Sequence, residues 1–549
     1  MLTRKYKKPT ALLAIFLAFV VALTACSGGG GSGDKGTSSS SPSAGASVKP
    51  TGNGKEGWIV DKETELTVLM QEHPSFPVKA FNDSAFLKYI LDKTGIKLNI
   101  MSVPDGDAYK QKLSLVLNST DMPDIIWNSS NDANINALGE KGAFLAYDDY
   151  LSKTPDIKST IDKYPDIRKT IAASNGKLYI MPRILFDTMT ELFIFRKDLL
   201  DAEKLGAPKT FDELEQVLLA LKAKYPDKVP WINRNGSEHI INRLAHSWNT
   251  GYEPATGGFY LNTTSKKYVY GPTEDGFKQL VVWLKKMFDQ GLLDKEYALR
   301  TTPQWEQAYA NEGALFTIDF IARIQTLNDQ YLGKKSNARV AAVAPPKGPT
   351  GNSGIEGRSP VLANAGIVVT KNAKNPDAAF KFVNWVYGAG RDIVRYGIEG
   401  ETFAKNSDGT ISISAQMQGK NNPTGKDLVK DFGWVYYLNK YEFPLEHEKP
   451  LNPNDNKDEN LYLYSRKVME DAKGIVQWDP TLSFDEEQNK VLRSKGTAVT
   501  DYFKQNIDKF IMGARPIGEW DAFVKELQSR GLADLEKVYN DAYQAYLKK

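Results

Sequence analysis

Residues 86–100 read FLKYILDKTGIKLNI, and this stretch decides the class of fold. The apolar residues of its first half recur at helical spacing, and Gly95 can end that helix in a left-handed turn. From Ile96 to Ile100, apolar and polar residues alternate, which is typical of a strand. The stretch therefore predicts a helix that leads directly into a strand.

The same succession of elements extends to both sides. Leu66 to Met70 indicates a strand before the helix, the apolar residues between Tyr109 and Leu117 recur at helical spacing, and residues 124–127 (DIIW) indicate another strand. Strand, helix, strand, helix and strand in this order predict a parallel sheet with helices on its faces, which is an α/β fold.

A second region has the same character with longer helices. Thr210 to Glu213 has the pattern of a capping box, and Asn375-Pro376 places a cap and a first-turn proline before another helix. The segment from Trp520 to Tyr546 is also helical in its pattern. Because about 520 mature residues can form at least two domain-sized units, we expect at least two α/β units.

The N-terminus has the pattern of an export signal. Four basic residues precede an uncharged, mostly apolar run from Ala11 to Ala25, and the run ends in Leu23-Thr24-Ala25-Cys26. The run is shorter than the roughly 20 residues of a membrane-spanning helix, and small residues before Cys26 suit a signal peptidase. The ending Leu-x-Ala-Cys resembles the bacterial lipobox, which implies that acyl chains such as palmitate modify Cys26.

Cys26 is the only cysteine among the 549 residues, so its lipidation would leave no thiol for a disulfide, a metal or nucleophilic catalysis. From Ser27 to about Gly57 the chain is rich in Gly, Ser, Thr and Pro, which predicts a disordered tether. We therefore expect a lipoprotein signal peptide over 1–25, the lipidated cysteine and tether over 26–57, and a folded body over 58–549. This order of segments predicts a lipid-anchored protein on the extracytoplasmic face of the cell membrane.

The charge of the chain is nearly balanced. The formal net charge is +3, and without the four basic residues of the signal, 66 Lys and Arg stand against 67 Asp and Glu. No polybasic face is implied, so we expect no nucleic-acid partner.

Beyond the tether, short motifs follow one another in a characteristic order. They are Thr94-Gly95-Ile96, LVLNSTDMPDII over 115–126, GAFLAYD over 142–148, NGKLYIMP over 175–182, FRKDLL over 195–200, PKTFDEL over 208–214, NPDAA over 375–379, and the close from Phe510 to Leu532. With these motifs the chain resembles the extracellular solute-binding proteins of family 1, the lipoproteins that serve carbohydrate ABC importers, and in particular their long subgroup. The resemblance covers most of the chain after the tether.

The resemblance implies a two-lobed, periplasmic-binding-protein-like α/β fold of type II, with discontinuous lobes joined by a hinge and a ligand in the cleft. We expect lobe 1 to comprise about 58–180 plus 315–370, and lobe 2 about 185–314 plus 371–549. The implied function is the capture of a sugar, an oligosaccharide by analogy with long relatives, and its delivery to the permease subunits of an ABC importer. A monomer that binds its ligand without catalysis is expected.

Neither a metal ion nor another cofactor is expected. Long members of the family with a calcium loop have an insertion rich in Asp, Asn and Gly after the helix that starts at Thr210. Here residues 222–230 read KAKYPDKVP, whereas calcium takes about six to eight oxygen ligands. The acidic run 452–460 (NPNDNKDEN) lacks the spacing and the central glycine of an EF-hand.

Sugar recognition pairs flat aromatic rings with fixed hydrogen-bonding side chains in a concave site. Trp127 and Asn128 end a predicted parallel strand, where ligands bind in α/β sheets, although packing in the core is the alternative for Trp127. For Arg183 and Asp187 the alternative is a mutual salt bridge, and Asp319, inside an apolar run, needs either a protein donor or a ligand hydroxyl. The candidate ligand-binding residues are Glu72, His73, Trp127, Asn128, Arg183, Asp187, Trp248, Asp319, Glu356, Arg358, Trp434 and Tyr436.

Two other functions stay open on the sequence. A lipid-anchored glycoside hydrolase needs two carboxylates that flank the scissile bond, and the 67 acidic residues could supply them. We find neither a Gly-x-Ser-x-Gly nor a His-Glu-x-x-His motif and assign no catalytic residue. The third function is that of a sugar sensor without transport.

Overall fold

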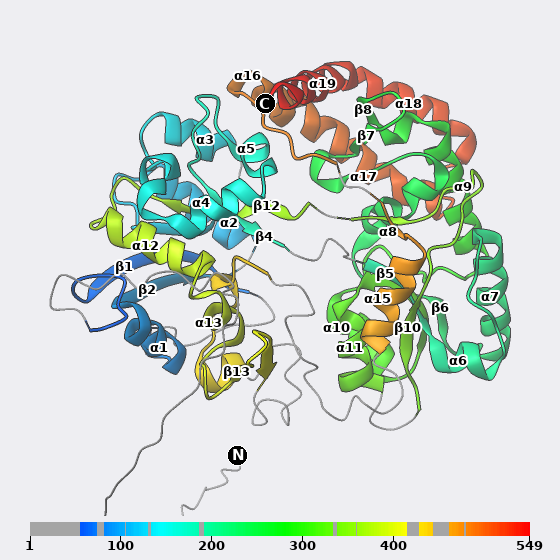
Figure 1. The fold of residues 1–549 in the computed structure, drawn as a ribbon. Helices are drawn as coiled ribbons and strands as arrows, with labels where there is room; N and C mark the ends of the chain where they lie inside the picture. The colour runs from blue at the N-terminus through cyan, green and yellow to red at the C-terminus, as the bar shows by residue number, and fades with distance from the viewer. Residues whose placement is uncertain are drawn as a thin grey trace, which may run out of the picture. The chain divides into compact units, whose positions relative to one another are not determined.

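The computed structural model describes residues 55–73, 82–104, 106–129, 133–185, 191–332, 337–357, 359–413, 428–442, 461–476 and 479–549. None of the helices in these ranges has both the length and the apolar composition of a membrane-spanning segment. The described residues build two main sheets with separate hydrophobic cores, and we name the two parts lobe 1 and lobe 2 after these sheets (Figure 1).

The lobe 1 sheet has five strands in the order β2-β1-β3-β12-β4. Their bounds are β1 (Thr64–Gln71), β2 (Ile96–Val103), β3 (Ile125–Ser129), β4 (Met181–Ile184) and β12 (Val361–Val369). β1 is parallel to β2 and β3, whereas β12 is antiparallel to both β3 and β4. The first four strands of the chain therefore end at one edge of this sheet, and we call it the lobe 1 edge.

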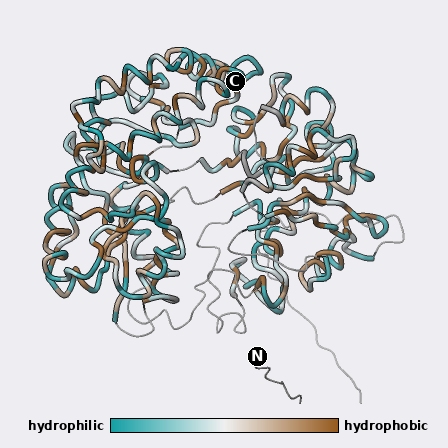
Figure 2. The backbone as a smooth tube through the Cα atoms, turned by 180° about the vertical axis from the view of Figure 1, so that it is seen from behind, coloured by the Kyte–Doolittle hydropathy of each residue, from teal (hydrophilic) through white to brown (hydrophobic). Residues whose placement is uncertain are grey.

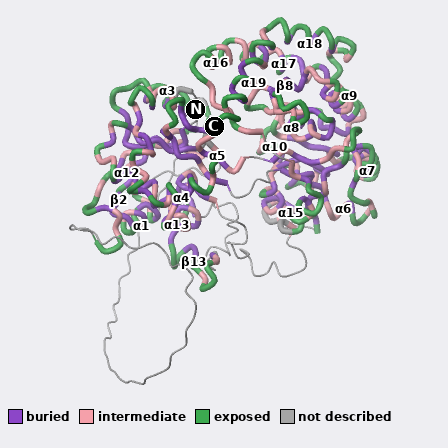
Figure 3. The backbone as a smooth tube through the Cα atoms, turned by 45° about the horizontal axis from the view of Figure 1, so that its top comes forward, coloured by how far each residue is buried: buried purple, intermediate pink, exposed green. Residues whose placement is uncertain are grey.

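Helices cover this sheet and complete the core of lobe 1. They are α1 (Ala85–Thr94), α2 (Asp107–Leu117), α3 (Ala133–Glu140), α4 (Pro155–Lys163), α5 (Asp166–Ile171), α12 (Pro376–Tyr387) and α13 (Arg391–Tyr396), with the hairpin β13 (Phe403–Lys405) and β14 (Ile411–Ile413). Hydrophobic segments follow the strands of the sheet (Figure 2), and the same strands are buried below exposed helix surfaces (Figure 3).

The helix and strand predicted from residues 86–100 are confirmed as α1 and β2. The side chain of Ser84 caps α1 by accepting a hydrogen bond from Leu87 N at 3.2 Å. Gly95 ends the helix with φ of 74°, and a Cβ atom added there would lie 2.4 Å from the ring of Trp58. Glycine is therefore required at this position both by the left-handed turn and by the close packing.

The lobe 2 sheet has four strands in the order β10-β5-β9-β6. Their bounds are β5 (Glu191–Arg196), β6 (Val229–Trp231), β9 (Ala314–Phe320) and β10 (Val340–Val343). β5 is antiparallel to β9 and β10, whereas β6 is parallel to β9. Alternate residues of β5 enter different hydrophobic clusters, Phe193 and Phe195 on one side, Leu192 and Ile194 on the other, so both faces of the sheet are covered.

The helices of lobe 2 come from the middle and the end of the chain. They are α6 (Lys197–Ala202), α7 (Phe211–Lys224), α8 (Gly236–Ala245), α9 (Asp275–Asp289), α10 (Thr302–Ala310), α11 (Ala322–Thr326), α15 (Leu461–Asp471), α16 (Glu486–Val491), α17 (Thr497–Ile511), α18 (Trp520–Ser529) and α19 (Leu532–Lys548). Two small ribbons join them: β7 (Phe259–Asn262) with β8 (Lys267–Tyr270), and β11 (Ile355–Glu356) with β15 (Ile475–Val476). The predicted cap at Thr210 is present, since its hydroxyl accepts from Glu213 N at 3.1 Å.

The two cores correct the expected division of the chain. Leu315 and Phe316 of β9 belong to the core of lobe 2, although residues 315–370 were expected in lobe 1. Phe380 and Val383 of α12 belong to the core of lobe 1, although residues 371–549 were expected in lobe 2. The division is wrong because β9 pairs with β5 and β6, while β12 returns to lobe 1 and the chain stays there through α12 and α13.

We expect Phe316→Ala to lower the free energy of unfolding by about 3–5 kcal/mol, because a large core ring would leave a cavity. The ring of Phe316 lies 4.4 Å from that of Phe195 and 5.5 Å from that of Trp231. In hydrogen exchange, β5 and β10 should lose protection while β1 and β3 retain it.

Urea unfolding measures the change in free energy, and Leu299→Ala, at a side chain that is 84% exposed, is the control, with an expected effect within about 0.5 kcal/mol. Loss of protection in β1 and β3 rather than β5 and β10 would contradict the assignment of β9 to lobe 2.

Candidate ligand-binding site

Polar and aromatic side chains gather at the lobe 1 edge, where β1, β3 and β4 end. Glu72 and His73 follow β1, Asn128 lies near the end of β3, and Arg183 lies near the end of β4. In α/β sheets ligands bind at this end of parallel strands. The structure therefore brings four predicted residues to the same edge.

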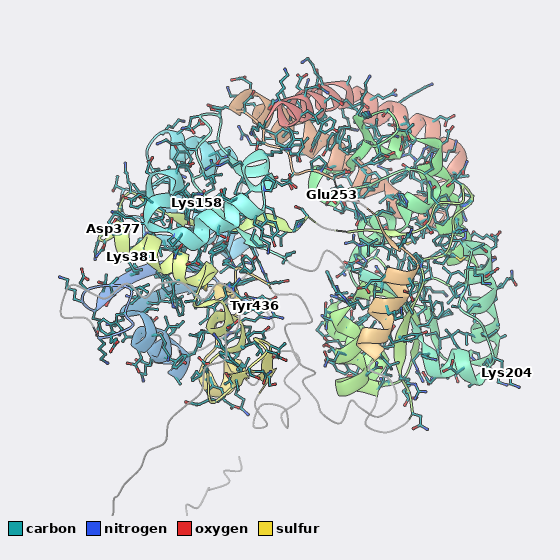
Figure 4. All side chains as sticks on the ribbon, in the orientation of Figure 1. Lys158, Lys204, Glu253, Asp377, Lys381 and Tyr436 are labelled. Atoms are coloured by element: carbon teal, nitrogen blue, oxygen red, sulfur yellow. The ribbon has the colours of Figure 1, made fainter. Side chains whose placement is uncertain are left out.

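An aromatic group forms at this edge. The rings of His73 and Tyr436 are 4.5 Å apart, and those of His73 and Tyr437 are 5.4 Å apart. The guanidinium of Arg183 lies 5.6 Å from the centre of the Tyr436 ring, and its Nη2 atom lies 2.5 Å from Glu442 Oε1. Arg183 thus pairs with Glu442, and Asp187, its partner in the alternative interpretation of the sequence, lies outside the described residues. Tyr436, labelled in Figure 4, is half-buried.

Three predicted tryptophans are core residues in this structure. Trp127 is fully buried, and its indole Nε1 donates to Tyr437 O at 2.6 Å. Trp434 is buried and donates from its Nε1 to Val394 O at 2.9 Å. Trp248 is buried 4.4 Å from the ring of Phe211. None of the three presents a ring face to solvent, so packing accounts for them better than sugar stacking does.

The side chain of Asn128, the residue after Trp127, also forms a hydrogen bond within the protein. Its backbone has φ of 65°, and its Oδ1 atom accepts a hydrogen bond from Nζ of Lys440. Lys440 is fully buried, and burial lowers its pKa well below the ordinary value for lysine. Asn128 therefore acts in this structure as the acceptor for the buried amino group of Lys440.

In the lobe 2 sheet, β6 and β9 end at the edge where β5 begins, and we call it the lobe 2 edge. Asp319 near the end of β9 is buried and is held by Arg234 through two bonds of 2.7 Å, Nε to Oδ2 and Nη2 to Oδ1. The donor that the sequence required for Asp319 is thus a protein group. The guanidinium of Arg234 in turn lies 5.3 Å from the centre of the Trp305 ring.

Glu191, the first residue of β5, forms the second ion pair of this edge. Its buried carboxylate lies 2.8 Å from His239 Nε2 and 3.1 Å from Arg243 Nη2. Burial acts to raise the pKa of Glu191, but His239 and Arg243 outweigh it and lower the pKa to about 2. Sequence analysis missed this group because its members are about fifty residues apart and carry no motif.

Beside this edge, lobe 2 contains a cavity of about 680 Å³. Its walls come from the end of α8 and the loop that follows, the β7–β8 ribbon, Asn352, and the β11–β15 ribbon. We name it the Tyr260 pocket, after the aromatic ring in its wall. The predicted residue Glu356 lines it together with Asp479, which sequence analysis missed.

The two acids of the Tyr260 pocket are coupled through the backbone. Asp479 N donates to Glu356 Oε1 at 3.2 Å, and Leu261 N donates to Asp479 Oδ2 at 2.7 Å. Burial, followed by the charges of Asp479 and Glu253, raises the pKa of Glu356 to about 8, although Arg243 acts in the opposite direction. Burial also raises the pKa of Asp479, to about 6.

Arg358 and Cys26 lie outside the described residues.

The strand order of lobe 1, the discontinuous lobes and the polar edges define the class of two-lobed solute-binding proteins, and comparison with known proteins supports this class. Residues 80–391 match the family model described as bacterial extracellular solute-binding protein. The chain therefore belongs to the bacterial extracellular solute-binding protein family.

Relatives and solved structures match nearly the whole length. The chain is 24% identical to the polygalacturonan/rhamnogalacturonan-binding protein YtcQ of Bacillus subtilis, with 97% of this chain and 98% of that protein covered. It is 21% identical to the fructooligosaccharide ABC transporter substrate-binding protein FusA of Streptococcus pneumoniae serotype 4, with 89% and 92% covered. A solved structure has a TM-score of 0.73 at 19% identity and covers 89% of this chain and 100% of its own chain. It is the HMO-binding, ABC-transporter-associated solute-binding protein of Bifidobacterium longum infantis.

We expect the protein to lose stability as the pH rises from about 5 to about 8.5, and Glu356→Gln to reduce this loss. An acid whose pKa is raised in the folded state stabilises the fold below its unfolded pKa of about 4.5. That stabilisation disappears as the pH rises through the folded-state pKa of Glu356, about 8.

The melting temperatures of wild type and Glu356→Gln, measured across this pH range, should therefore converge or cross. The difference between them should change by roughly 2–5 °C over the range. Asp521→Asn, which removes a carboxylate whose side chain is 82% exposed, should run parallel to wild type. A wild-type profile parallel to that of Glu356→Gln would contradict the raised pKa.

Proposed function

We propose that this protein captures an oligosaccharide between the lobe 1 edge and the lobe 2 edge and delivers it to an ABC importer. The observation that carries the proposal is the short connection between the edges. β4 ends at Ile184 on the lobe 1 edge, and β5 begins at Glu191 on the lobe 2 edge. Seven residues of extended chain span at most about 25 Å, which is short enough for an oligosaccharide to contact both edges.

The chemistry of the edges suits a sugar. The half-buried ring of Tyr436, tilted by 55° to the ring of His73, supplies aromatic surface for the C–H face of a pyranose or furanose. Charged groups such as Arg183 and Glu442 are already oriented by each other, and charged donors and acceptors make the stronger hydrogen bonds to hydroxyls. The names of the relatives FusA and YtcQ, which both concern oligo- or polysaccharides, support the same ligand class.

The state of Asp319 and Glu191 at the lobe 2 edge supports binding without cleavage. A glycosidase needs one carboxyl group as acid and another as base or nucleophile. Asp319 is occupied by Arg234, and Glu191 by His239 and Arg243. We therefore infer a binding protein that closes around the sugar, because a ligand that contacts both lobes favours the closed form.

The proposed working site is the outer face of the cell membrane. A monomer anchored through acyl chains on Cys26 would present its body to dissolved sugars and to the permease subunits of the importer. The sequence pattern before Cys26 supports this anchor.

Tyr436→Ala should weaken sugar binding about thirtyfold, or by about 2 kcal/mol, because it removes the central ring of the aromatic group at the lobe 1 edge. Isothermal titration calorimetry with fructo-oligosaccharides, galacto-oligosaccharides and oligogalacturonates measures the effect on the ligand that binds the wild type. Tyr464→Ala, at a tyrosine that is 42% exposed, is the matched control. Chromatography of the same mixtures should return every sugar intact, and steady release of shorter products would instead indicate a hydrolase.

Cys26→Ser should abolish lipid attachment and release the protein from the membrane. Metabolic labelling with palmitate and partition into Triton X-114 measure both effects. Ser27→Ala changes the neighbouring residue without touching the thiol and should behave as wild type. Equal labelling of Cys26→Ser and wild type would rule out the anchor.

A further inference from the structure

The Tyr260 pocket has the size and the composition of a ligand site. Its volume of about 680 Å³ falls within the usual range for small-molecule sites, about 300–1,000 Å³. Its walls combine apolar surface from Tyr260, Leu261 and Val476 with side-chain amides and hydroxyls. The ring of Tyr260 packs directly on Gly251, where an added Cβ would lie 2.2 Å from it, and its hydroxyl lies 2.7 Å from Glu274 Oε2.

Part of the hydrogen-bonding capacity of this wall is unused by the described residues. Glu356 Oε1 and Asp479 Oδ2 each accept from a backbone N–H group, whereas no donor among the described residues reaches Glu356 Oε2 or Asp479 Oδ1. The ring of His246 makes no hydrogen bond within the described ranges, and burial lowers its pKa, so it is neutral near pH 7. These groups are available to accept hydrogen bonds from hydroxyls or to donate them.

The charge of the pocket restricts what it can hold. None of the described residues that line it is Lys or Arg. Arg243, a described cation that acts on Glu356, is already bound to Glu191. At pH 7 a carboxylate ligand would lie beside the ionised Asp479, whose pKa is about 6, with no cation among the described wall residues to pair with it, and like charges in a half-buried site are unfavourable. Within the described residues, no group of three His, Cys, Asp or Glu side chains has an arrangement that could hold a bridging metal ion.

We propose that the Tyr260 pocket is a subsite that takes an uncharged sugar unit of the bound oligosaccharide and rejects a uronic acid. The carboxyl oxygens of Glu356 and Asp479 accept from the sugar hydroxyls, and the Tyr260 ring and Val476 contact the C–H surface. This inference rests on the proposed function and assigns its ligand class. It also distinguishes the chain from its relative YtcQ, whose name refers to acidic polysaccharides.

The test uses the full mature chain and two chemically matched ligand series. One series consists of trigalacturonate and its fully methyl-esterified form, which share a skeleton and differ in charge. The other consists of neutral oligosaccharides, namely kestose, nystose and galactotriose. Calorimetric titration at pH 7 should find the tightest ligand among the uncharged sugars, and the ester should bind at least tenfold more tightly than trigalacturonate.

Two variants connect this preference to the pocket. Glu356→Gln and Asp479→Asn keep the side-chain size and should each weaken the best neutral ligand about tenfold, and Asp479→Asn, which removes the carboxylate that is ionised at pH 7, should also reduce the discrimination against trigalacturonate. Asp521→Asn, on the exposed surface of α18, is the control and should change neither. Melting curves confirm that each variant is folded before titration.

The outcomes separate the inference from the proposed function. Tight binding of a sugar that neither pocket variant affects would overturn the subsite but leave the proposed function intact. Preference for trigalacturonate over its ester would likewise overturn the subsite. Failure of every sugar in both series to bind would contradict the proposed function and the inference with it.

Discussion

The pairing of β12 with both β3 and β4 is the constraint on which the rest of the structure depends. The lobe 1 sheet is complete only after the chain has left it, built β5 to β11 in lobe 2, and returned. Because Val361 pairs with Ile184, the outgoing and returning segments adjoin each other at the lobe 1 edge. Each core contains residues from separate stretches of the chain. The order of the strands along the chain therefore links the two lobes, in addition to the segments that connect them.

Local signals in the sequence predicted the elements well, but not the core to which each belongs. The helix and strand around Gly95 were predicted because the helical spacing, the left-handed turn and the strand alternation all lie within fifteen residues. The apolar pattern of Ala314 to Ile321 indicates a buried strand equally well in either lobe. Its placement depends on pairing with β5, more than a hundred residues earlier, and such long-range pairing leaves no local trace.

The candidate site was predictable to a similar degree. His73, Arg183 and Tyr436 were candidates on the sequence, because His73 follows a predicted strand, Arg183 lies between two of the family motifs and Tyr436 lies in an aromatic cluster. Trp127 was a candidate because it ends a predicted strand. The end of a strand predicts the position of a residue but not the direction of its ring, and the ring of Trp127 lies 5.9 Å from that of Phe382 in the core. Arg234 and Asp479 were missed because their partners, Asp319 and Glu356, are 85 and 123 residues away.

The ribbon of β11 and β15 connects the Tyr260 pocket to the chain segment that returns to lobe 1. Glu356 is the last residue of β11, and the segment that returns to lobe 1 starts immediately after it, with Gly357 N donating to Val476 O at 3.0 Å. A ligand that formed a hydrogen bond with the Glu356 carboxyl group would therefore contact the residue that directly precedes the returning segment. A ligand in the Tyr260 pocket would therefore lie next to the start of the segment that connects lobe 2 to lobe 1.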